Sequence, residues 1–248
     1  MIEIEVHERV REVRLARPPV NALDRQLIRA LDEALVAQFD DPSCGAIVLS
    51  GAPGSFSAGL DVREVTAGAS AVESLVRAFW GLQERLVRAP KPVVAAITGH
   101  CPAGGMVIAL LCDHRIMARG EFAIGLNEVQ VGLYPGDTIH RAYVRLIGAA
   151  RAASLLSRGA LLEPEAALAA GLVDELAAPQ EVRRLAVAHA QSLLRLPPRA
   201  YARTRALVRA DLVELYAAPR ESLDSLLADG WAGEETQAAM ARLLRRPS

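Results

Sequence analysis

A long stretch without charged side chains constrains the fold of this chain more than any other feature of its sequence. The 21 residues from Pro92 to Cys112 include no Asp, Glu, Lys or Arg, and this length is sufficient for a membrane-spanning helix. Turn-forming or polar residues interrupt the stretch at Thr98, Gly99, His100, Pro102, Gly104 and Gly105. We therefore predict a buried strand over 92–98, a tight turn, and a buried helix from about Ala103, with no membrane span.

The apolar periodicity of the neighbouring segments is typical of strands that alternate with helices. Strands are predicted over 2–6, 10–15, 46–49, 92–98, 113–118, 121–124 and 172–176, and helices over 27–39, 72–86, 139–147, 150–156 and 164–170. In the first strand Ile2, Ile4 and Val6 alternate with polar residues, which predicts one buried face and one exposed face. Asn21 and Asp24 are candidate N-caps of the first helix. The fold class is α/β.

The C-terminal part of the chain has helical periodicity from 181 to 245, with breaks near Pro197 and Pro219. We predict an α/β core over 1–196 and a helical region over 197–248. The apolar residues of this region are more numerous than two or three isolated helices would bury: Leu207, Val208, Leu212, Leu215, Leu223, Leu226 and Leu227. We expect the region to pack against the core and against a neighbouring subunit.

Composition and charge exclude several classes of protein. The 248 residues include 28 basic and 29 acidic side chains, so the net charge of -1 gives no reason to expect binding to nucleic acid or to an anionic membrane. An apolar content of 52% excludes low-complexity disorder. Three scattered cysteines do not make a disulfide framework, and we expect the alternating N-terminal residues to form a strand rather than a signal peptide. We expect a cytoplasmic protein.

The motifs of common cofactor and metal sites are missing. Neither Gly-x-x-x-x-Gly-Lys nor Gly-x-Gly-x-x-Gly after a strand is present, so no nucleotide cofactor is indicated. His100, Cys101, Cys112 and His114 are metal-ligating residue types. However, Cys101 and Cys112 bracket a predicted helix whose ends lie roughly 16 Å apart, too far for one ion. We expect both cysteines to be buried structural residues, and no metal.

Two glycine-containing loops could present backbone N–H groups to a ligand. Ala103-Gly104-Gly105 begins a predicted helix, where the first N–H groups have no helical partner and the helix dipole favours negative charge. The loop from Phe56 to Asp61 follows a buried strand. Together the two loops could form a two-donor oxyanion site. Close packing between helix and strand would require the same glycines, and the residues alone do not separate the two interpretations.

Glu128 is a candidate acid/base residue. It is the only ionisable residue between positions 123 and 133, and burial among apolar neighbours would raise its pKa toward neutrality. A solvent-facing glutamate on a loop is the competing interpretation.

Taken together, these residues resemble the crotonase superfamily of acyl-CoA enzymes, and most of all its Δ3,Δ2-enoyl-CoA isomerase branch. The resemblance rests on three blocks, 56–61 (Phe-Ser-Ala-Gly-Leu-Asp), 99–113 (with Cys-Pro-Ala-Gly-Gly) and 124–132 (with Gly-Leu-Asn-Glu). A fourth segment, Ala166 to Asp174, also matches, so the likeness covers nearly the whole chain.

The resemblance implies a spiral of β-β-α repeats with C-terminal helices that mediate trimer formation, as a homotrimer or a dimer of trimers. It implies that the N–H groups of Leu60 and Gly104 form an oxyanion hole for a thioester carbonyl and that Glu128 is the catalytic acid/base. It places the CoA site at Ala58, Gly59, Leu60, Asp61, Val62, Gly104 and Asn127. The CoA belongs to the acyl-CoA substrate, and no separate cofactor is implied. Arg17, Arg25 and Arg63 are candidates for the CoA phosphates.

One departure from the family pattern indicates the activity. Hydratases of this superfamily use a second glutamate three residues after the oxyanion glycine, and this chain has Val107 there. Valine cannot activate water, whereas moving a double bond from C3 to C2 needs only one base, Glu128. We therefore expect an enoyl-CoA isomerase of fatty acid β-oxidation. A hydratase-like or hydrolase reaction, to which Asp137 could contribute, and a non-catalytic acyl-CoA-binding protein remain the alternatives.

Overall fold

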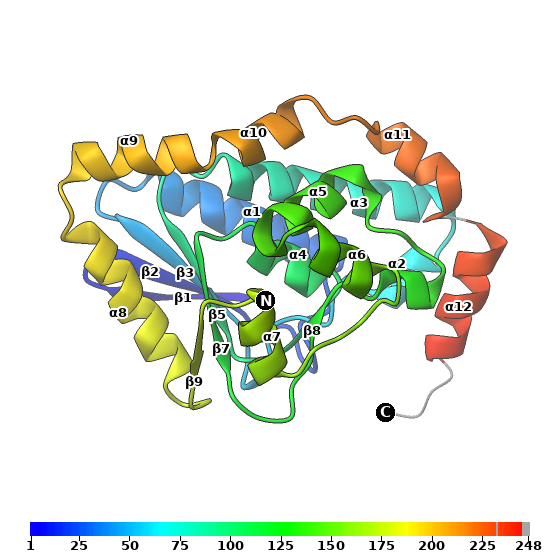
Figure 1. Cartoon of the computed structure of the whole chain (residues 1–248), viewed down its shortest axis with the longest axis horizontal. Coiled ribbons are helices and arrows are strands. Elements are labelled where there is room, and N and C mark those ends of the chain that lie inside the picture. Colours follow the sequence, from blue (N-terminus) through cyan, green and yellow to red (C-terminus); the bar gives the residue numbers. More distant parts are fainter. Residues whose placement is uncertain (232, 245–248) are drawn as a thin grey trace.

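The chain winds through a repeated unit of two strands and a helical segment (Figure 1). Three successive turns of the spiral each add one strand to each of two sheets, while the first two strands and the last strand belong to the first sheet alone. The structure is a computed structural model that describes residues 1–231 and 233–244. The first sheet has the order β1 (Ile2–His7), β2 (Val10–Leu15), β3 (Ala46–Ser50), β5 (Val93–Ile97), β7 (His114–Ala118), β9 (Glu175–Ala177). The second sheet has the order β4 (Gly54–Ser55), β6 (Gly99–Pro102), β8 (Ile124–Gly125).

Helices follow each pair of strands. They are α1 (Arg25–Asp40), α2 (Val62–Val65), α3 (Ala69–Val87), α4 (Gly104–Leu110), the 3-10 turn η1 (Glu128–Val131), α5 (Gly136–Ile147), α6 (Ala149–Leu156), α7 (Pro164–Ala170) and α8 (Val182–Leu194). Strand pairs are parallel except for β1 and β2. The structure confirms the predicted α/β spiral of β-β-α repeats.

The central strands are buried on both faces, which explains their continuous apolar sequences. In β3, Ile47 and Leu49 belong to the larger apolar core, while Ala46 and Val48 belong to a second cluster that includes residues of α8. Helix α8 contacts β3, β5 and β7, and it covers one face of the sheet at the left of Figure 1. The sheet is therefore a middle layer between α8 and the remaining helices.

The uncharged stretch forms β5, β6 and α4, and every residue of β5 and of α4 is buried. The predicted turn after residue 98 is wrong, because 99–102 form β6, which pairs with β4 and β8. Gly99 makes this pairing possible, since a Cβ atom there would lie 2.0 Å from the carbonyl carbon of Gly54. No described helix is long and apolar enough to cross a membrane.

Three further predictions near the strands need correction. Strand β1 forms, but Ile4 is 46% exposed and Val6 is 62% exposed, because β1 is the edge strand and no other described segment covers these side chains. The strand predicted over 121–124 is confined to Ile124–Gly125. Asp24 caps α1 by accepting from the Leu27 N–H at 2.7 Å, whereas Asn21 does not cap it.

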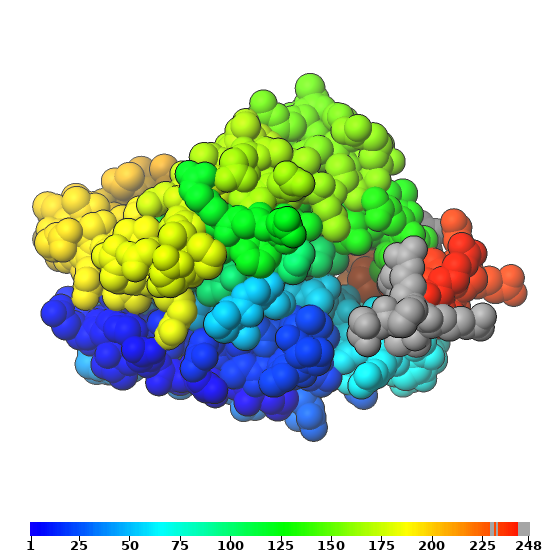
Figure 2. Space-filling model, turned by 90° about the horizontal axis from the view of Figure 1, so that it is seen from below, coloured from blue at the N-terminus to red at the C-terminus, as the bar shows by residue number. Residues whose placement is uncertain are grey.

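The C-terminal helices extend along one side of the spiral and then fold back over one end of it (Figure 1). They are α9 (Pro198–Val208), α10 (Ala210–Ala217), α11 (Leu223–Leu226), the π-helical turn η2 (Leu227–Trp231) and α12 (Glu234–Leu244). Helix α12, red in Figure 2, lies beside the cyan part of the chain, and it contacts α2. The expected packing of this region against the core is confirmed, while its contact with a neighbouring subunit stays a prediction.

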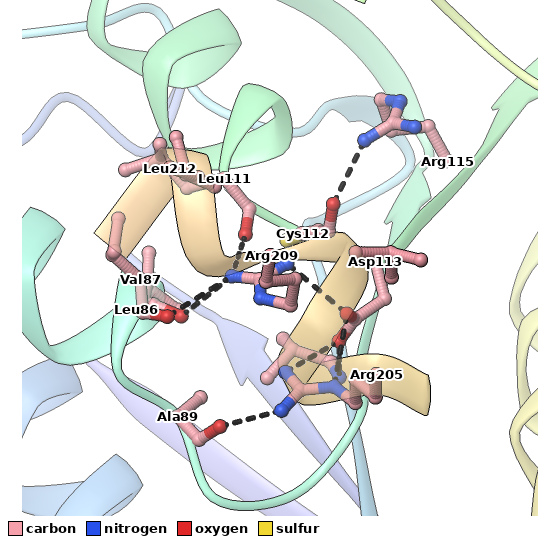
Figure 3. A network of polar contacts seen from close by, with 12 residues as sticks. Leu86, Val87, Ala89, Leu111, Cys112, Asp113, Arg115, Arg205, Arg209 and Leu212 are labelled. Carbon is pink, nitrogen blue, oxygen red and sulfur yellow. Dashed lines mark hydrogen bonds and ion pairs between the residues drawn. The ribbon is translucent and has the colours of Figure 1, made fainter. Parts of the chain in front are cut away.

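Asp113 holds α9 and α10 against the core (Figure 3). Its carboxylate accepts from the Arg205 guanidinium at 2.8 and 3.0 Å and from Arg209 at 3.0 Å. The same guanidinium groups donate to backbone carbonyls of the core, including Ala89 at 2.7 Å and Leu111 at 3.0 Å. We call this set of contacts the Asp113 clamp. It connects α9 and α10 to the chain that follows α3 and α4.

Candidate active site

A cavity of about 140 Å³ collects most of the residues that sequence analysis singled out. Ala58, Leu60 and Val62 line it on one side of the fold, and Gly104 and Val107 of α4 contribute another part of its wall. Asn127 and Glu128 belong to the same lining. Leu226, Trp231 and Met240 extend the wall from the C-terminal helices. The cavity therefore lies between the spiral core and the helices that fold back over it.

The backbones of Leu60 and Gly104 lie close together at the cavity. A Cβ atom on Gly104 would be 3.3 Å from the backbone nitrogen of Leu60 and 3.3 Å from Cα of Gly59. Neither N–H donates to an acceptor within the described chain. Because both residues line the cavity, an oxygen atom placed there has two unpaired backbone donors within its reach.

The residue before α4 has a strained backbone conformation. Ala103 has φ of 47° and ψ of -123°, a conformation that residues with a side chain rarely adopt. Gly105 permits the approach of the other loop, since a Cβ atom there would lie 2.5 Å from the Ser57 carbonyl oxygen. The packing interpretation applies to Gly105, whereas the N–H of Gly104 has no acceptor within the described chain and its role as an oxyanion donor stays a prediction.

Hydrogen bonds fix the loop that carries Leu60 and leave its N–H free. The Ser57 hydroxyl donates to the Asn21 carbonyl at 2.8 Å and accepts from the Gly59 N–H at 3.2 Å. The Ala58 N–H donates to Val20 at 2.9 Å. These hydrogen bonds hold the loop in one conformation, which preorganises the donor.

Glu128 is buried at the beginning of η1, and its side chain borders the cavity. One carboxyl oxygen, Oε2, has no hydrogen-bond partner within the described residues. Desolvation by burial raises the pKa of Glu128 from 4.5 to about 7. The solvent-facing alternative is therefore wrong, and the expected rise in pKa is confirmed. A carboxylate with this pKa is a stronger base than an ordinary glutamate and is still ionised in part at neutral pH.

Val107 is buried one helical turn after Gly104 and lines the cavity, as its position in the sequence predicted. Asp137, by contrast, is not among the residues that line the cavity. It lies in the first turn of α5, where one carboxyl oxygen is 3.6 Å from the Arg141 guanidinium. Among the described residues, the cavity wall therefore has one carboxyl group, that of Glu128, and most of the other lining side chains are apolar.

The residues expected to bind CoA have different environments. Gly59 and Asp61 do not line the cavity. Asp61 caps α2 by accepting from the Arg63 N–H at 3.0 Å and is paired with Arg17 at 2.9 Å. Arg25 is paired with Glu64 at 3.0 Å.

Arg63 is the least committed of the three candidate arginines. Arg17 binds a second carboxylate, that of Asp24, at 2.8 Å, so both Arg17 and Arg25 have partners. Arg63 is exposed, and its guanidinium has no partner within the described chain. It follows Val62, which lines the cavity. Arg63 is therefore free to bind an anionic group near the mouth of the site.

Comparison with known proteins identifies the family. Residues 5–243 match the family described as enoyl-CoA hydratase/isomerase. The chain belongs to this family. Human mitochondrial enoyl-CoA delta isomerase 1 is 33% identical over 212 residues, which cover 84% of this chain and 70% of the relative. A probable enoyl-CoA hydratase of Rhizobium meliloti (strain 1021) is 34% identical over 191 residues, covering 77% of this chain and 74% of the relative.

A solved structure supports the same assignment of fold. Human mitochondrial delta3-delta2-enoyl-CoA isomerase superposes with a TM-score of 0.92 at 28% identity, covering 99% of this chain and 97% of the other. The crotonase fold that the sequence resemblance implied is confirmed. Since both isomerases and hydratases occur among such relatives, membership of the enoyl-CoA hydratase/isomerase family leaves the choice of reaction to the residues of the cavity.

Sequence analysis missed three polar residues near the site of this family member. Gln83 of α3 and Trp231 of η2 line the cavity. Tyr143 of α5 is fully buried, and both its burial and the charge of Glu128 raise its pKa above the ordinary value. Gln83 continues the stripe of Val72, Val76 and Phe79 along α3, so a polar residue on a buried helix face was the available signal. No sequence signal pointed to Trp231, because no local pattern shows where the C-terminal helices fold back.

The metal-ligating residue types are not grouped as one site. Cys101 and Cys112 are buried free thiols, as expected. Within 1–231 and 233–244, one group of three side chains has ligand atoms close enough for a cation, namely Glu5, His7 and Glu12. Arg183 forms ion pairs with both of these glutamates. The guanidinium of Arg183 already pairs with both carboxylates, so the group is explained as an ion-pair network.

Proposed function

We propose that this member of the enoyl-CoA hydratase/isomerase family is a Δ3,Δ2-enoyl-CoA isomerase, acting on unsaturated acyl chains in β-oxidation. The observation that carries this proposal is the lining of the cavity. Among the described residues that line it, Glu128 is the only one with an ionisable side chain, and Val107 is aliphatic. One buried base next to two open N–H donors suits a reaction that moves a proton and adds nothing to the substrate.

The reaction requires one base used twice. The Glu128 carboxylate removes a proton from C2 of the 3-enoyl thioester, and the electron pair of the C–H bond moves toward the carbonyl oxygen. The resulting dienolate oxygen accepts hydrogen bonds from the N–H groups of Leu60 and Gly104, and each such donor is typically worth about 3 kcal/mol. The dienolate then takes the proton back from Glu128 at C4, the carbonyl forms again, and the double bond lies between C2 and C3.

The same lining disfavours hydration. Adding water needs a group that positions and deprotonates the water and a group that protonates C2. Glu128 can serve in one of these roles at a time, and the methyl groups of Val107 cannot serve in the other. An apolar wall also keeps water from the dienolate, so that the dienolate is protonated rather than hydrated.

A parallel assay of two substrates tests this proposal. A 3-enoyl-CoA and a 2-enoyl-CoA of equal chain length are incubated with the protein, and products are resolved by chromatography. We expect conversion of the first into 2-enoyl-CoA and no hydration of the second. Formation of 3-hydroxyacyl-CoA would establish a hydratase, release of free CoA a hydrolase, and binding without turnover a non-catalytic acyl-CoA-binding protein.

We also propose that Arg63 contacts the phosphates of CoA and that the active protein is a homotrimer or a dimer of trimers. Helix α9 has no buried residue, and at its end Leu207 is 74% exposed and Val208 is 60% exposed. Adjacent exposed apolar side chains of this size are typical of a contact surface. A second copy of the chain would bury them.

A further inference from the structure

Two side chains in the cavity wall carry N–H groups without an acceptor. Gln83 is 3% exposed, and its Oε1 accepts from the Tyr216 hydroxyl at 2.8 Å. Its amide nitrogen has no acceptor among the described residues. Trp231 is 8% exposed, and its indole nitrogen is buried without a partner within the same part of the chain. Both residues line the cavity, one from α3 and one from η2.

The indole nitrogen of Trp231 is a fully buried donor without a partner among the described residues, and such a donor costs about 1–3 kcal/mol relative to a satisfied group. The amide nitrogen of Gln83 is not fully buried and also has no acceptor among these residues. The Tyr216 hydroxyl donates to Oε1 of Gln83, which leaves the amide nitrogen as the group available to another partner. Indole can only donate. A saturated hydrocarbon tail would leave both groups unpaired and would remove any water that pairs with them. An oxygen atom on the acyl chain would instead satisfy one donor or both.

The charge of the cavity wall restricts the kind of oxygen. The described lining residues include no Lys, Arg or His, and their only ionisable side chain, Glu128, is negative when ionised. A carboxylate at the end of the chain would be buried without a counter-charge, which is strongly unfavourable. An uncharged acceptor, such as a ketone oxygen, an ether oxygen or a hydroxyl group, could accept from these donors and needs no counter-charge.

We propose that the acyl chain of the natural substrate carries an uncharged oxygen, which Gln83 and Trp231 recognise. This inference rests on the proposed acyl-CoA site and goes beyond the isomerase reaction, because it names the class of acyl chain. The two residues belong to different elements of the fold, and we expect them to favour an oxygen at one position of the chain.

A series of thioesters tests the proposal. The probes are 3-enoyl-CoA compounds of one chain length, either unsubstituted or with one ketone oxygen at successive carbons from C6 onward. We expect at least one oxo compound to exceed the unsubstituted compound in kcat/KM by about fivefold or more, as one or two buried hydrogen bonds would produce. A wild-type protein that prefers the unsubstituted chain over every oxo compound would overturn the inference.

Variants separate recognition from support of the fold. Gln83→Met or Trp231→Phe should reduce the preference for the favoured oxo compound toward unity. Tyr216→Phe removes the bond between α10 and Gln83 but keeps the amide in the wall, so it should lower stability and retain the preference. If both the Gln83 and the Trp231 variants keep the full preference, the two side chains are structural and the proposal is wrong.

Binding measurements keep this inference distinct from the isomerase proposal. Saturated acyl-CoA compounds with and without the same ketone oxygen cannot isomerise, so their dissociation constants report recognition alone. Tighter binding of the oxo compound supports the inference even if no 3-enoyl-CoA is converted, a result that would refute only the isomerase proposal. Equal or weaker binding of all oxo compounds, with isomerisation intact, refutes only the inference.

Discussion

Replacing Glu128 by glutamine should remove the activity and at the same time stabilise the protein at alkaline pH. Glutamine keeps the size and the hydrogen-bonding capacity of the side chain but cannot accept the C2 proton. We expect turnover to fall by about a thousandfold or more, with acyl-CoA binding retained. A variant that keeps more than a tenth of wild-type turnover would show that Glu128 is not the base.

The effect on stability follows from the position of the side chain. Burial raises the pKa of Glu128 from 4.5 to about 7, so between these values the folded protein holds a proton that the unfolded chain has lost. The folded state is therefore penalised as pH rises through this window, up to a limit of about 3 kcal/mol for a shift of this size. Glutamine does not titrate, and the variant avoids the penalty.

Urea denaturation of both proteins at pH 5 and pH 8.5 measures this difference. The free energy of unfolding of Glu128→Gln relative to wild type should increase by about 2–3 kcal/mol between the two pH values. All other titrating groups are common to both proteins, so their contributions cancel. An unchanged difference at the two pH values would mean that Glu128 titrates like an exposed glutamate, and the account of its activation would be refuted. The kcat/KM of wild type should rise through about pH 7 as Glu128 ionises.

Three other predictions concern neighbouring features. Val107→Glu places a second carboxyl group near Glu128 and should produce weak hydratase activity, with stability reduced by about 1–3 kcal/mol, whereas a Val107→Gln control should not hydrate 2-enoyl-CoA. Arg63→Ala should raise KM for a CoA thioester several-fold and leave KM for the corresponding N-acetylcysteamine thioester unchanged, since that analogue has no phosphates. Leu207→Asp, or the same change at Val208, should convert the assembly into monomers in sedimentation experiments without loss of helix content in circular dichroism, and a wild-type monomer at micromolar concentration would contradict the proposed assembly.

The residues of the candidate site that sequence analysis found share a local signal. Glu128 is isolated in an apolar segment, and Gly104 begins a helix after a strand, so each could be recognised from its immediate neighbours. Such local signals do not show that Gln83 and Trp231 line the same cavity. They meet the same cavity only because η2 returns to α3 after most of the chain has intervened.

The α/β class of the fold could be predicted from local sequence patterns, whereas details that depend on distant segments could not. Alternation in the first strand distinguishes two faces, but it does not say whether another segment covers either of them, and Ile4 and Val6 stay exposed. Gly99 and Pro102 are typical turn residues, yet they belong to β6, because close approach to β4 requires a residue without Cβ at Gly99. Both differences depend on partners that are distant in the sequence.

The Asp113 clamp has a consequence for the order in which the protein matures. Arg209 donates to the carbonyls of Leu86 and Val87 at the end of α3 and to Leu111 after α4, and these residues precede Arg209 by 98 to 123 positions in the sequence. During synthesis from the N-terminus, α3 and α4 are made before Arg205 and Arg209. Until these arginines are present, water must satisfy the last carbonyl groups of the two helices. Because α3 and α4 provide walls of the cavity, a nascent chain has the base and the oxyanion donors in sequence long before it has a finished site. Substrate recognition should therefore appear as a late and cooperative event, at the moment when the C-terminal helices dock.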